Sequence, residues 1–389
     1  MHFLEGPQYI YHRLRVSVKR IFDFGIWGST LFFLKKSFSS QSVKKILLVN
    51  LQGIGDLVMT TPFIDGLREQ FPNANITYLC SGKNGDLFVS DDRVDVVHSY
   101  SGGFLDGRFL KLLSFVRNQK FDLCVSLFYA QHASFLTLFS KARYIMGPLY
   151  GLWSYTNFKN PLGSSSLTRD LRLNGSVFSR QLGFSLTEVD DLHLPVDYSL
   201  KKSVHKKYIS PSLNRKDSLV IALHVGGSWE TKQWVASRWK ELIFGLQKKY
   251  AKRNPVFFFT GGKGDASAVR EVVSLVSVDV SAVNLSGKLS LQELVAFLDS
   301  VGLFVTVDAG PMHVASALGV KTVALFGVTD PHLLVSENNL FKVVHNPLRH
   351  THLFGGCFDF NNKPLKSCHV TMRQIGVEDV LGKIGEMDV

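Results

Sequence analysis

The apolar residues of this chain fall mainly into short continuous runs, each followed by a polar or glycine-rich loop and then by residues with helical spacing. Buried strands are predicted at 45–51, 75–80, 94–99, 121–127, 219–224, 255–260, 303–307 and 321–326. Helices are predicted at 57–71, 104–119, 133–141, 239–250, 265–276, 291–300 and 312–318. Apolar runs without polar alternation are typical of strands buried on both faces of a parallel sheet. The alternation of strands and helices therefore predicts an α/β fold.

A polar, basic stretch separates two such series of strands and helices. We expect an N-terminal extension at 1–43, a Rossmann-like domain at 44–200, a linker at 201–218 and a second Rossmann-like domain at 219–389. Ligands of open parallel sheets bind at the carboxyl ends of the strands. The pattern therefore predicts two parallel-sheet domains that face a central cleft.

The extension contains one apolar stretch, residues 21–34, which Asp23 interrupts and basic residues flank on both sides. It is too short to cross a bilayer and is not followed by the cleavage site of a signal peptide. A helix at a membrane surface, with its cations on acidic head groups, fits this pattern. A helix packed on the protein's own surface fits it equally well, and the sequence leaves both interpretations open.

The overall charge favours anionic partners. The chain has 389 residues and a formal net charge of +12, with 45% hydrophobic and 20% charged residues. A basic globular protein of this kind suits nucleic acid, acidic lipid or a phosphorylated substrate. The sequence contains no zinc-finger spacing, basic heptad helix or aromatic RNA-binding signature, so nucleic acid is the weakest of the three.

The four cysteines do not indicate a metal site. Cys80 and Cys124 lie in apolar strand-like runs and are expected to be inert core residues. Cys357 and Cys368 flank a polar loop that supplies too few ligands for a metal ion. Scattered cysteines of this kind fit a reducing compartment, which favours a cytoplasmic protein.

Four loops carry candidate chemistry, and the first is Gly53-Ile54-Gly55-Asp56, directly after a predicted strand. It is only half of a dinucleotide-binding fingerprint, because Val58 stands where the third glycine belongs. The glycines permit close approach to the backbone. Asp56 fits either a helix cap or a carboxylate that accepts a proton from a substrate hydroxyl.

Two further loops in the second half suit a nucleotide. The loop at 226–232 offers backbone N–H groups, a hydroxyl and a cation to a diphosphate through Gly227, Ser228 and Lys232. The loop at 261–265 is placed to approach a ribose through Gly262 and Asp265. The Walker pattern is absent from both loops. The plainer interpretation of Lys232 is a solvated lysine, and that of the loop at 261–265 is an ordinary connection between strand and helix.

The fourth loop joins the strand at 303–307 to a helix. Unpaired N–H groups and the helix dipole make such a helix start favourable for phosphate. Its candidate residues are Asp308, Gly310, Pro311, Met312 and His313. An ordinary crossover with a capping Asp is the alternative.

Three motifs in these regions resemble glycosyltransferase family 9, the ADP-heptose–lipopolysaccharide heptosyltransferases. The first is the strand–Gly-Asp–Thr–Pro opening at 46–62, and the second lies at 224–234. The third and most specific lies at 307–331, where the runs D-x-G-P-M-H-x-A-x-A-L-G and A-L-F-G-x-T-D-P are both complete. The resemblance extends through most of residues 44–385 and is weaker at 100–215.

The resemblance implies a GT-B fold and inverting transfer of a sugar, expected to be heptose from ADP-heptose, onto a lipopolysaccharide core or related glycolipid. Carried over by position, Asp56 is the general base, Lys232 binds the donor phosphates and Asp308 orients the donor sugar. Gly53 and Gly55 are expected on the acceptor side. The resemblance implies no obligatory metal or cofactor. It also implies a peripheral protein that works at the inner face of the cytoplasmic membrane.

Two other functions are consistent with the same residues. A nucleotide-sugar epimerase on this fold would need acid–base groups around the donor sugar and no acceptor site. A protein that binds nucleotide or anionic lipid without chemistry would not need Asp56 opposite a phosphate site.

Overall fold

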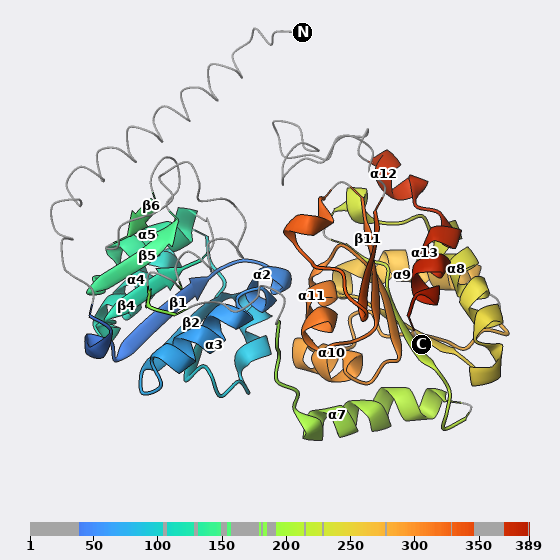
Figure 1. The fold of residues 1–389 in the computed structure, drawn as a ribbon, viewed down its shortest axis with the longest axis horizontal. Coiled ribbons are helices and arrows are strands. Elements are labelled where there is room, and N and C mark those ends of the chain that lie inside the picture. Colours follow the sequence, from blue (N-terminus) through green and yellow to red (C-terminus); the bar gives the residue numbers. More distant parts are fainter. Residues whose placement is uncertain are drawn as a thin grey trace, which may run out of the picture. The chain divides into compact units, whose positions relative to one another are not determined.

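The computed structural model of the chain describes residues 39–103, 107–127, 131–148, 154–156, 179, 182–184, 192–213, 215–227, 229–276, 278–327, 329–345, 369–387 and 389. They form two compact units (Figure 1). Unit 1 comprises the described residues of 1–51, 66–80 and 94–185, and unit 2 those of 52–65, 81–93 and 186–389. The apolar stretch at 21–34 lies outside the described residues, and no helix within them is both long and apolar enough to cross a membrane.

Unit 1 is built on a six-stranded sheet with the order β3-β2-β1-β4-β5-β6. Its strands are β1 (Lys45–Asn50), β2 (Asn75–Ser81), β3 (Val96–Tyr100), β4 (Leu123–Ser126), β5 (Tyr144–Pro148) and β6 (Ser154–Thr156). β1 pairs in parallel with β2 and β4, and β4 pairs in parallel with β5, whereas β6 runs antiparallel to β5. Helices α4 (Gly107–Gln119) and α5 (Gln131–Phe139) contribute Phe109 and Leu136 to an apolar cluster with β1.

Unit 2 has a second six-stranded sheet, of order β12-β11-β10-β7-β8-β9. Its strands are β7 (Val220–His224), β8 (Val256–Thr260), β9 (Ala282–Asn284), β10 (Leu303–Val307), β11 (Thr322–Phe326) and β12 (Phe341–His345). All neighbouring strands in it are parallel. Numbered within its own unit, each sheet has the strand order of a Rossmann fold. The predicted α/β class with two Rossmann-like parallel sheets is confirmed.

Helices cover both faces of the unit 2 sheet (Figure 1). The helices of this unit are α2 (Ile54–Val58), α7 (Tyr198–Val204), α8 (Ala236–Lys249), α9 (Ala266–Leu275), α10 (Leu291–Leu298), α11 (Gly310–Ala317), α12 (His369–Gln374) and α13 (Val377–Gly385). α8, α9 and α13 pack on one face, and α10 and α11 on the other. The loops of the sheet therefore emerge between two helical layers.

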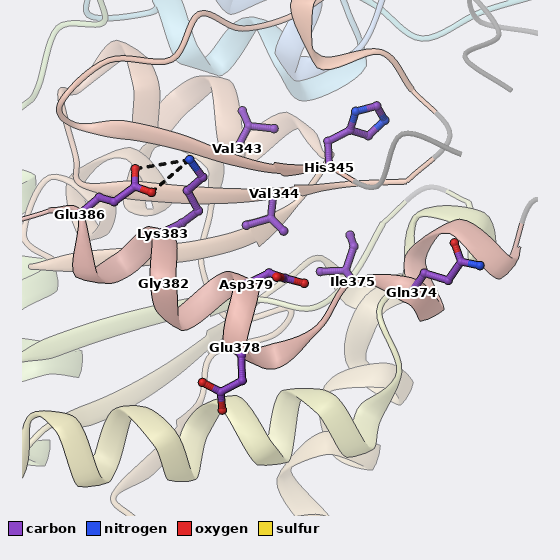
Figure 2. A pocket seen from close by; sticks show the side chains of 10 residues that line it. All are labelled: Val343, Val344, His345, Gln374, Ile375, Glu378, Asp379, Gly382, Lys383 and Glu386. Carbon is purple, nitrogen blue, oxygen red and sulfur yellow. Dashed lines mark hydrogen bonds and ion pairs between the residues drawn. The ribbon is translucent and has the colours of Figure 1, made fainter. Parts of the chain in front are cut away.

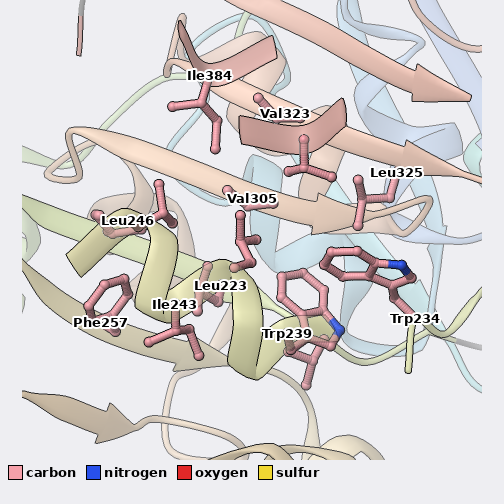
Figure 3. Packing of buried hydrophobic residues seen from close by; sticks show 14 of the residues in the cluster. Leu223, Trp234, Trp239, Ile243, Leu246, Phe257, Val305, Val323, Leu325 and Ile384 are labelled. Atoms are coloured by element: carbon pink, nitrogen blue, oxygen red, sulfur yellow. The ribbon is translucent and has the colours of Figure 1, made fainter. Parts of the chain in front are cut away.

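Burial on both faces explains the continuous apolar runs in the sequence. On one face, Leu223 and Val305 pack against Trp239 of α8 (Figure 3). The rings of Trp234 and Trp239 meet edge to face, with centroids 5.2 Å apart. On the other face, the rings of Phe258 and Phe297 are 5.5 Å apart. Because successive residues of a strand point to opposite faces, a strand covered on both sides needs apolar residues at every position.

The helix predicted at 57–71 is in fact two helices, α2 and α3 (Thr61–Gln70). At the break, the hydroxyl of Thr60 donates to the Leu57 carbonyl at 2.6 Å, and that of Thr61 to the Val58 carbonyl at 2.8 Å. Pro62 lies in the first turn of α3, where its missing N–H is tolerated, but it cannot continue a preceding helix. The single-helix prediction is wrong because Pro62 interrupts the hydrogen-bond ladder.

Residues 201–218, expected to be a linker, include helical turns that fold against unit 2. Asp197 caps α7, because its Oδ1 accepts hydrogen bonds from the N–H groups of Ser199 and Leu200 at 2.8 and 3.0 Å. The Lys201 Nζ lies 2.6 Å from Asp299 Oδ2 at the end of α10. An N-terminal cap and an ion pair thus order a segment whose polar composition alone indicates a connection.

Candidate active site

Three of the predicted loops meet at one edge of the unit 2 sheet. They follow β7, β8 and β10, which are parallel neighbours with β7 in the middle. His224, at the end of β7, is in register with Thr260 of β8 and with Thr306 of β10. The carboxyl ends of parallel neighbours lie side by side, and ligands of open α/β sheets bind there. The structure thus gathers the loops at 225–232, 261–265 and 308–310.

An ion pair joins two of these loops. The Lys232 Nζ lies 2.6 Å from Asp308 Oδ2, and the two side chains are 21% and 6% exposed. Lys232 ends a single helical turn after β7, and its N–H donates to the Trp229 carbonyl at 2.9 Å. Asp308 directly follows β10, and its N–H donates to the Leu325 carbonyl. The pair places one cation, largely shielded from water, beside the start of α11.

Asp56 belongs to the same compact unit as this ion pair. Its Oδ2 accepts a hydrogen bond from the Gly53 N–H at 3.1 Å, so the carboxylate caps its own helix α2. Burial raises the pKa of Asp56 to about 6, while the N–H groups of Gly53 and of Asp56 itself, and the charge of Lys232, act to lower it. The cap does not prevent proton transfer, because a carboxylate has acceptor positions on two oxygens.

The start of α11 contributes mostly buried side chains. Pro311, Met312 and His313 are all buried. Met312 packs in an apolar cluster with Phe326, and its N–H donates to the Ala309 carbonyl at 3.0 Å. Met312 therefore holds α11 against the sheet, which differs from the donor contact expected of it. Gly310, at the first helical position, and His313 both approach α2.

Helix α2 rests on the first turn of α11. A Cβ atom at Gly55 would lie 2.6 Å from the His313 Cδ2, and one at Gly310 would lie 2.9 Å from the Ile54 Cβ. Both distances are shorter than non-bonded carbon atoms allow, so these two glycines permit the close approach. This packing places the Asp56 helix directly beside the loop that begins at Asp308.

The loop after β8 is organised by Asp265. Its Oδ2 accepts a hydrogen bond from the Gly262 N–H at 2.7 Å, and its side chain covers Gly226 of the loop after β7. It also acts on His224, a buried residue that is not among the predicted site residues. The His224 Nδ1 lies 3.1 Å from the Thr260 Oγ1, and burial lowers the pKa of His224 to about 4 although Asp265 acts to raise it.

The remaining candidate residues are Gly53, Gly227, Ser228 and Gly262. Gly53 and Gly262 are exposed, and Gly227 is half-buried. The carbonyl of Gly227 accepts a hydrogen bond from Gln233 Nε2 at 3.5 Å. Ser228 lies outside the described residues. The position of His224, a polar residue at the end of an apolar strand, is a sequence signal that could have identified it.

Other parts of unit 2 hold no predicted site residue. A hollow between β12 and α13 is lined by Val343, Val344, His345, Gln374, Ile375, Glu378, Asp379, Gly382, Lys383 and Glu386 (Figure 2). Within the described residues, no three His, Cys, Asp or Glu side chains gather as metal ligands would. Cys80 and Cys124 are buried free thiols, as expected, and burial raises the pKa of both. Cys357 and Cys368 lie outside the described residues.

The sequence is similar to known glycosyltransferases. The sequence model of glycosyltransferase family 9 (heptosyltransferase) matches residues 109–356. Lipopolysaccharide heptosyltransferase 1 of Campylobacter coli is 25% identical over 221 residues, which are 55% of this chain and 62% of that protein. The matched part is therefore less than two thirds of that relative's length.

Two solved structures share the fold. The glycosyl transferase family 9 protein of Veillonella parvula DSM 2008 superposes with a TM-score of 0.68 at 22% identity, covering 88% of this chain and 96% of that one. The ADP-heptose LPS heptosyltransferase II of E. coli superposes with a TM-score of 0.63 at 18% identity, covering 88% and 97%. At these identities the likeness concerns the fold, and it agrees with the GT-B class expected from the motifs.

Proposed function

Because the chain belongs to glycosyltransferase family 9, the heptosyltransferases, we propose that it transfers heptose from ADP-heptose to a lipopolysaccharide core or related glycolipid. The names of its relatives support this substrate pair: one is a lipopolysaccharide heptosyltransferase, and one structural neighbour is an ADP-heptose LPS heptosyltransferase. One observation supports the proposal most directly. The Asp56 carboxylate lies in the same unit as the Lys232–Asp308 ion pair, and the charge of Lys232 acts to lower its pKa.

The reaction is a single in-line displacement. Asp56 takes the proton of an acceptor hydroxyl, whose oxygen forms a bond to the anomeric carbon of the donor. The bond from that carbon to the β-phosphate oxygen breaks, and ADP leaves with the electron pair, so the configuration at the anomeric carbon inverts. A carboxylate with a pKa of about 6 suits this role, because it is ionised at pH 7 and more basic than an ordinary Asp.

The donor lies at the edge of the unit 2 sheet. Lys232 binds the diphosphate and stabilises the charge that develops on it, with Gly227 and the helix start at Gly310 around it. Asp308 orients the heptose and holds Lys232 in place until phosphate arrives. Gly262 and Asp265 approach the ribose, and Gly53 leaves room for the acceptor. The residues supply this charge stabilisation without a metal.

Replacement of Asp56 tests the proposal. Asp56→Asn keeps the size of the side chain but cannot accept the proton, so we expect kcat to fall by about 10²–10⁴-fold while ADP-heptose affinity is retained. Asp92→Asn, at an exposed carboxylate outside the site, is the matched control. Mass spectrometry detects the heptosylated acceptor, and NMR reports its anomeric configuration. Full transfer by Asp56→Asn, retention of configuration, or epimer formation without acceptor would contradict the proposal.

We also propose that the protein works at the cytoplasmic face of the inner membrane, as a peripheral protein. The net charge of +12 and a lipid-linked acceptor support this location. Sedimentation with anionic and neutral vesicles tests it, and we expect binding to the anionic vesicles only. A chain lacking residues 1–42 should sediment less if the extension anchors the protein; equal sedimentation would assign the binding to the folded units.

A further inference from the structure

We infer that His313 is a positioning residue, whose imidazole supports helix α2 at Gly55 and so fixes the place of Asp56 beside the donor loop. The inference rests on the proposed function, since it concerns the base of that reaction. It gives His313 and Gly55 a role different from the donor and acceptor contacts expected of them.

The contact itself is close and buried. A Cβ atom at Gly55 would lie 2.6 Å from the Cδ2, 3.1 Å from the Nε2 and 3.5 Å from the Cγ of His313. Three ring atoms at these distances mean that the imidazole lies against the backbone of α2. His313 is 4% exposed, so the ring has little space into which it can withdraw.

A second contact makes α2 and α11 interlock. A Cβ at Gly310 would lie 2.9 Å from the Ile54 Cβ and 3.5 Å from the Gly55 nitrogen. Each helix thus contributes a glycine to a close approach with the other. α11 is itself anchored, because Met312, Val314 and Ala315 are fully buried. α11 therefore provides a rigid support on which α2 packs.

Helix α2 depends on this support because it is short. It spans five residues, Ile54–Val58, and isolated helices of that length are unstable in water. Asp56 caps the same helix through Gly53, so the carboxylate moves with the helix as one body. A displacement of α2 at Gly55 therefore displaces the proposed base, and a misplacement of about 1 Å can cost about 100-fold in rate.

Steric complementation tests the inference. Gly55→Ala adds a methyl group against the imidazole, so we expect kcat to fall at least about tenfold while the donor KM changes less than about threefold. His313→Ala removes the ring and leaves α2 unsupported, so kcat falls as well. The double variant places the new methyl group in the vacated space, and we expect its kcat to exceed that of Gly55→Ala.

A matched control separates this effect from that of any added methyl group. Gly382→Ala lies in helix α13, where a Cβ would meet no atom within 4 Å, and it should leave kcat unchanged. The same cycle measured by urea unfolding reports whether the imidazole and Gly55 are coupled, independently of catalysis.

The outcomes distinguish this inference from the proposed function. Independent, multiplicative effects of the two substitutions on kcat, or a His313→Ala variant that only raises the donor KM, would overturn the positioning role. Wild-type kcat in Gly55→Ala would overturn it too, and Asp56→Asn would still lose transfer. If the wild-type chain transfers no heptose, the proposed function fails, and the unfolding cycle alone still decides whether His313 supports α2.

Discussion

Burial and nearby charge have opposite effects on the pKa of the Asp56 carboxyl group. Burial favours the protonated form and raises its pKa to about 6. The Gly53 N–H, its own N–H and the Lys232 cation favour the ionised form, so they lower the pKa. The balance leaves a base that is ionised at neutral pH and titrates where activity can report it.

The pH dependence of catalysis follows from this balance. We expect kcat/KM to fall about tenfold per pH unit below about pH 6, because protonated Asp56 cannot accept a proton. Lys232→Gln removes a cation that lowers the pKa of Asp56, so the acidic limb should move to higher pH, whatever the loss in donor affinity. Lys383→Gln, in an exposed ion pair on α13, is the control. An acidic limb that stays in place or moves to lower pH would contradict the electrostatic link.

The sequence anticipated individual residues to different degrees. Asp56, Lys232 and Asp308 stand at loop ends after apolar strands, and that position alone marks them as candidates. Their mutual arrangement was not predictable, because the Lys232–Asp308 ion pair joins residues far apart in the chain. The contact of Gly55 with His313 was equally out of reach, since it depends on how α2 packs on α11.

Among the elements, a buried arginine links Asp65 of α3 to the segment before β3. Arg93 donates from Nε and Nη2 to Asp91 at 2.8 and 2.6 Å, and from Nη1 to Asp65 at 2.7 Å. Its Nη2 also donates to the His193 carbonyl at 3.3 Å. The side chains of Arg93 and Asp91 are 10% and 1% exposed, so removal of one partner leaves a charge buried and unpaired.

Substitution of this arginine should therefore destabilise the protein. We expect Arg93→Ala to lower the free energy of unfolding by about 3–5 kcal/mol, because Asp91 then remains buried without its cation. Arg68→Ala breaks a more exposed pair with Asp95, with side chains 23% and 39% exposed, and should cost about 1 kcal/mol or less. Urea denaturation measures both. Equal losses in the two variants would show that burial does not set the strength of the Arg93 cluster.

Element prediction succeeded where one physical signal dominates. The central strands β7, β8, β10 and β11 are buried at every position, and all four were predicted. Gly319 follows α11 with a φ of +67°, a left-handed conformation that glycine adopts at the end of a helix without strain. The edge strand β9 was missed because its three residues are only half-buried and give no continuous apolar run.

At the scale of the whole molecule, two sheets of the same strand order carry different loops. Both have the Rossmann strand order, yet the three loops that could hold a nucleotide all follow strands of unit 2. The segment that bears Asp56 follows β1 of unit 1 in the chain but belongs to unit 2. The sequence therefore predicted the α/β class correctly but did not reveal that the proposed base and the proposed donor loops belong to one compact unit.

This arrangement makes nucleotide binding measurable as stabilisation. A ligand that binds only the folded state at 100 times its Kd adds about 2.7 kcal/mol, which corresponds to about 5–10 °C in the unfolding midpoint of a unit of this size. We expect ADP and ADP-heptose to produce such a shift, and UDP- and GDP-sugars to produce little. Lys232→Gln should reduce the shift because the diphosphate loses its cation, whereas Asp56→Asn should keep it because the base does not hold the donor. An equal shift with UDP-sugars would reject ADP-heptose as the specific donor. An undiminished shift in Lys232→Gln would remove that lysine from the phosphate site.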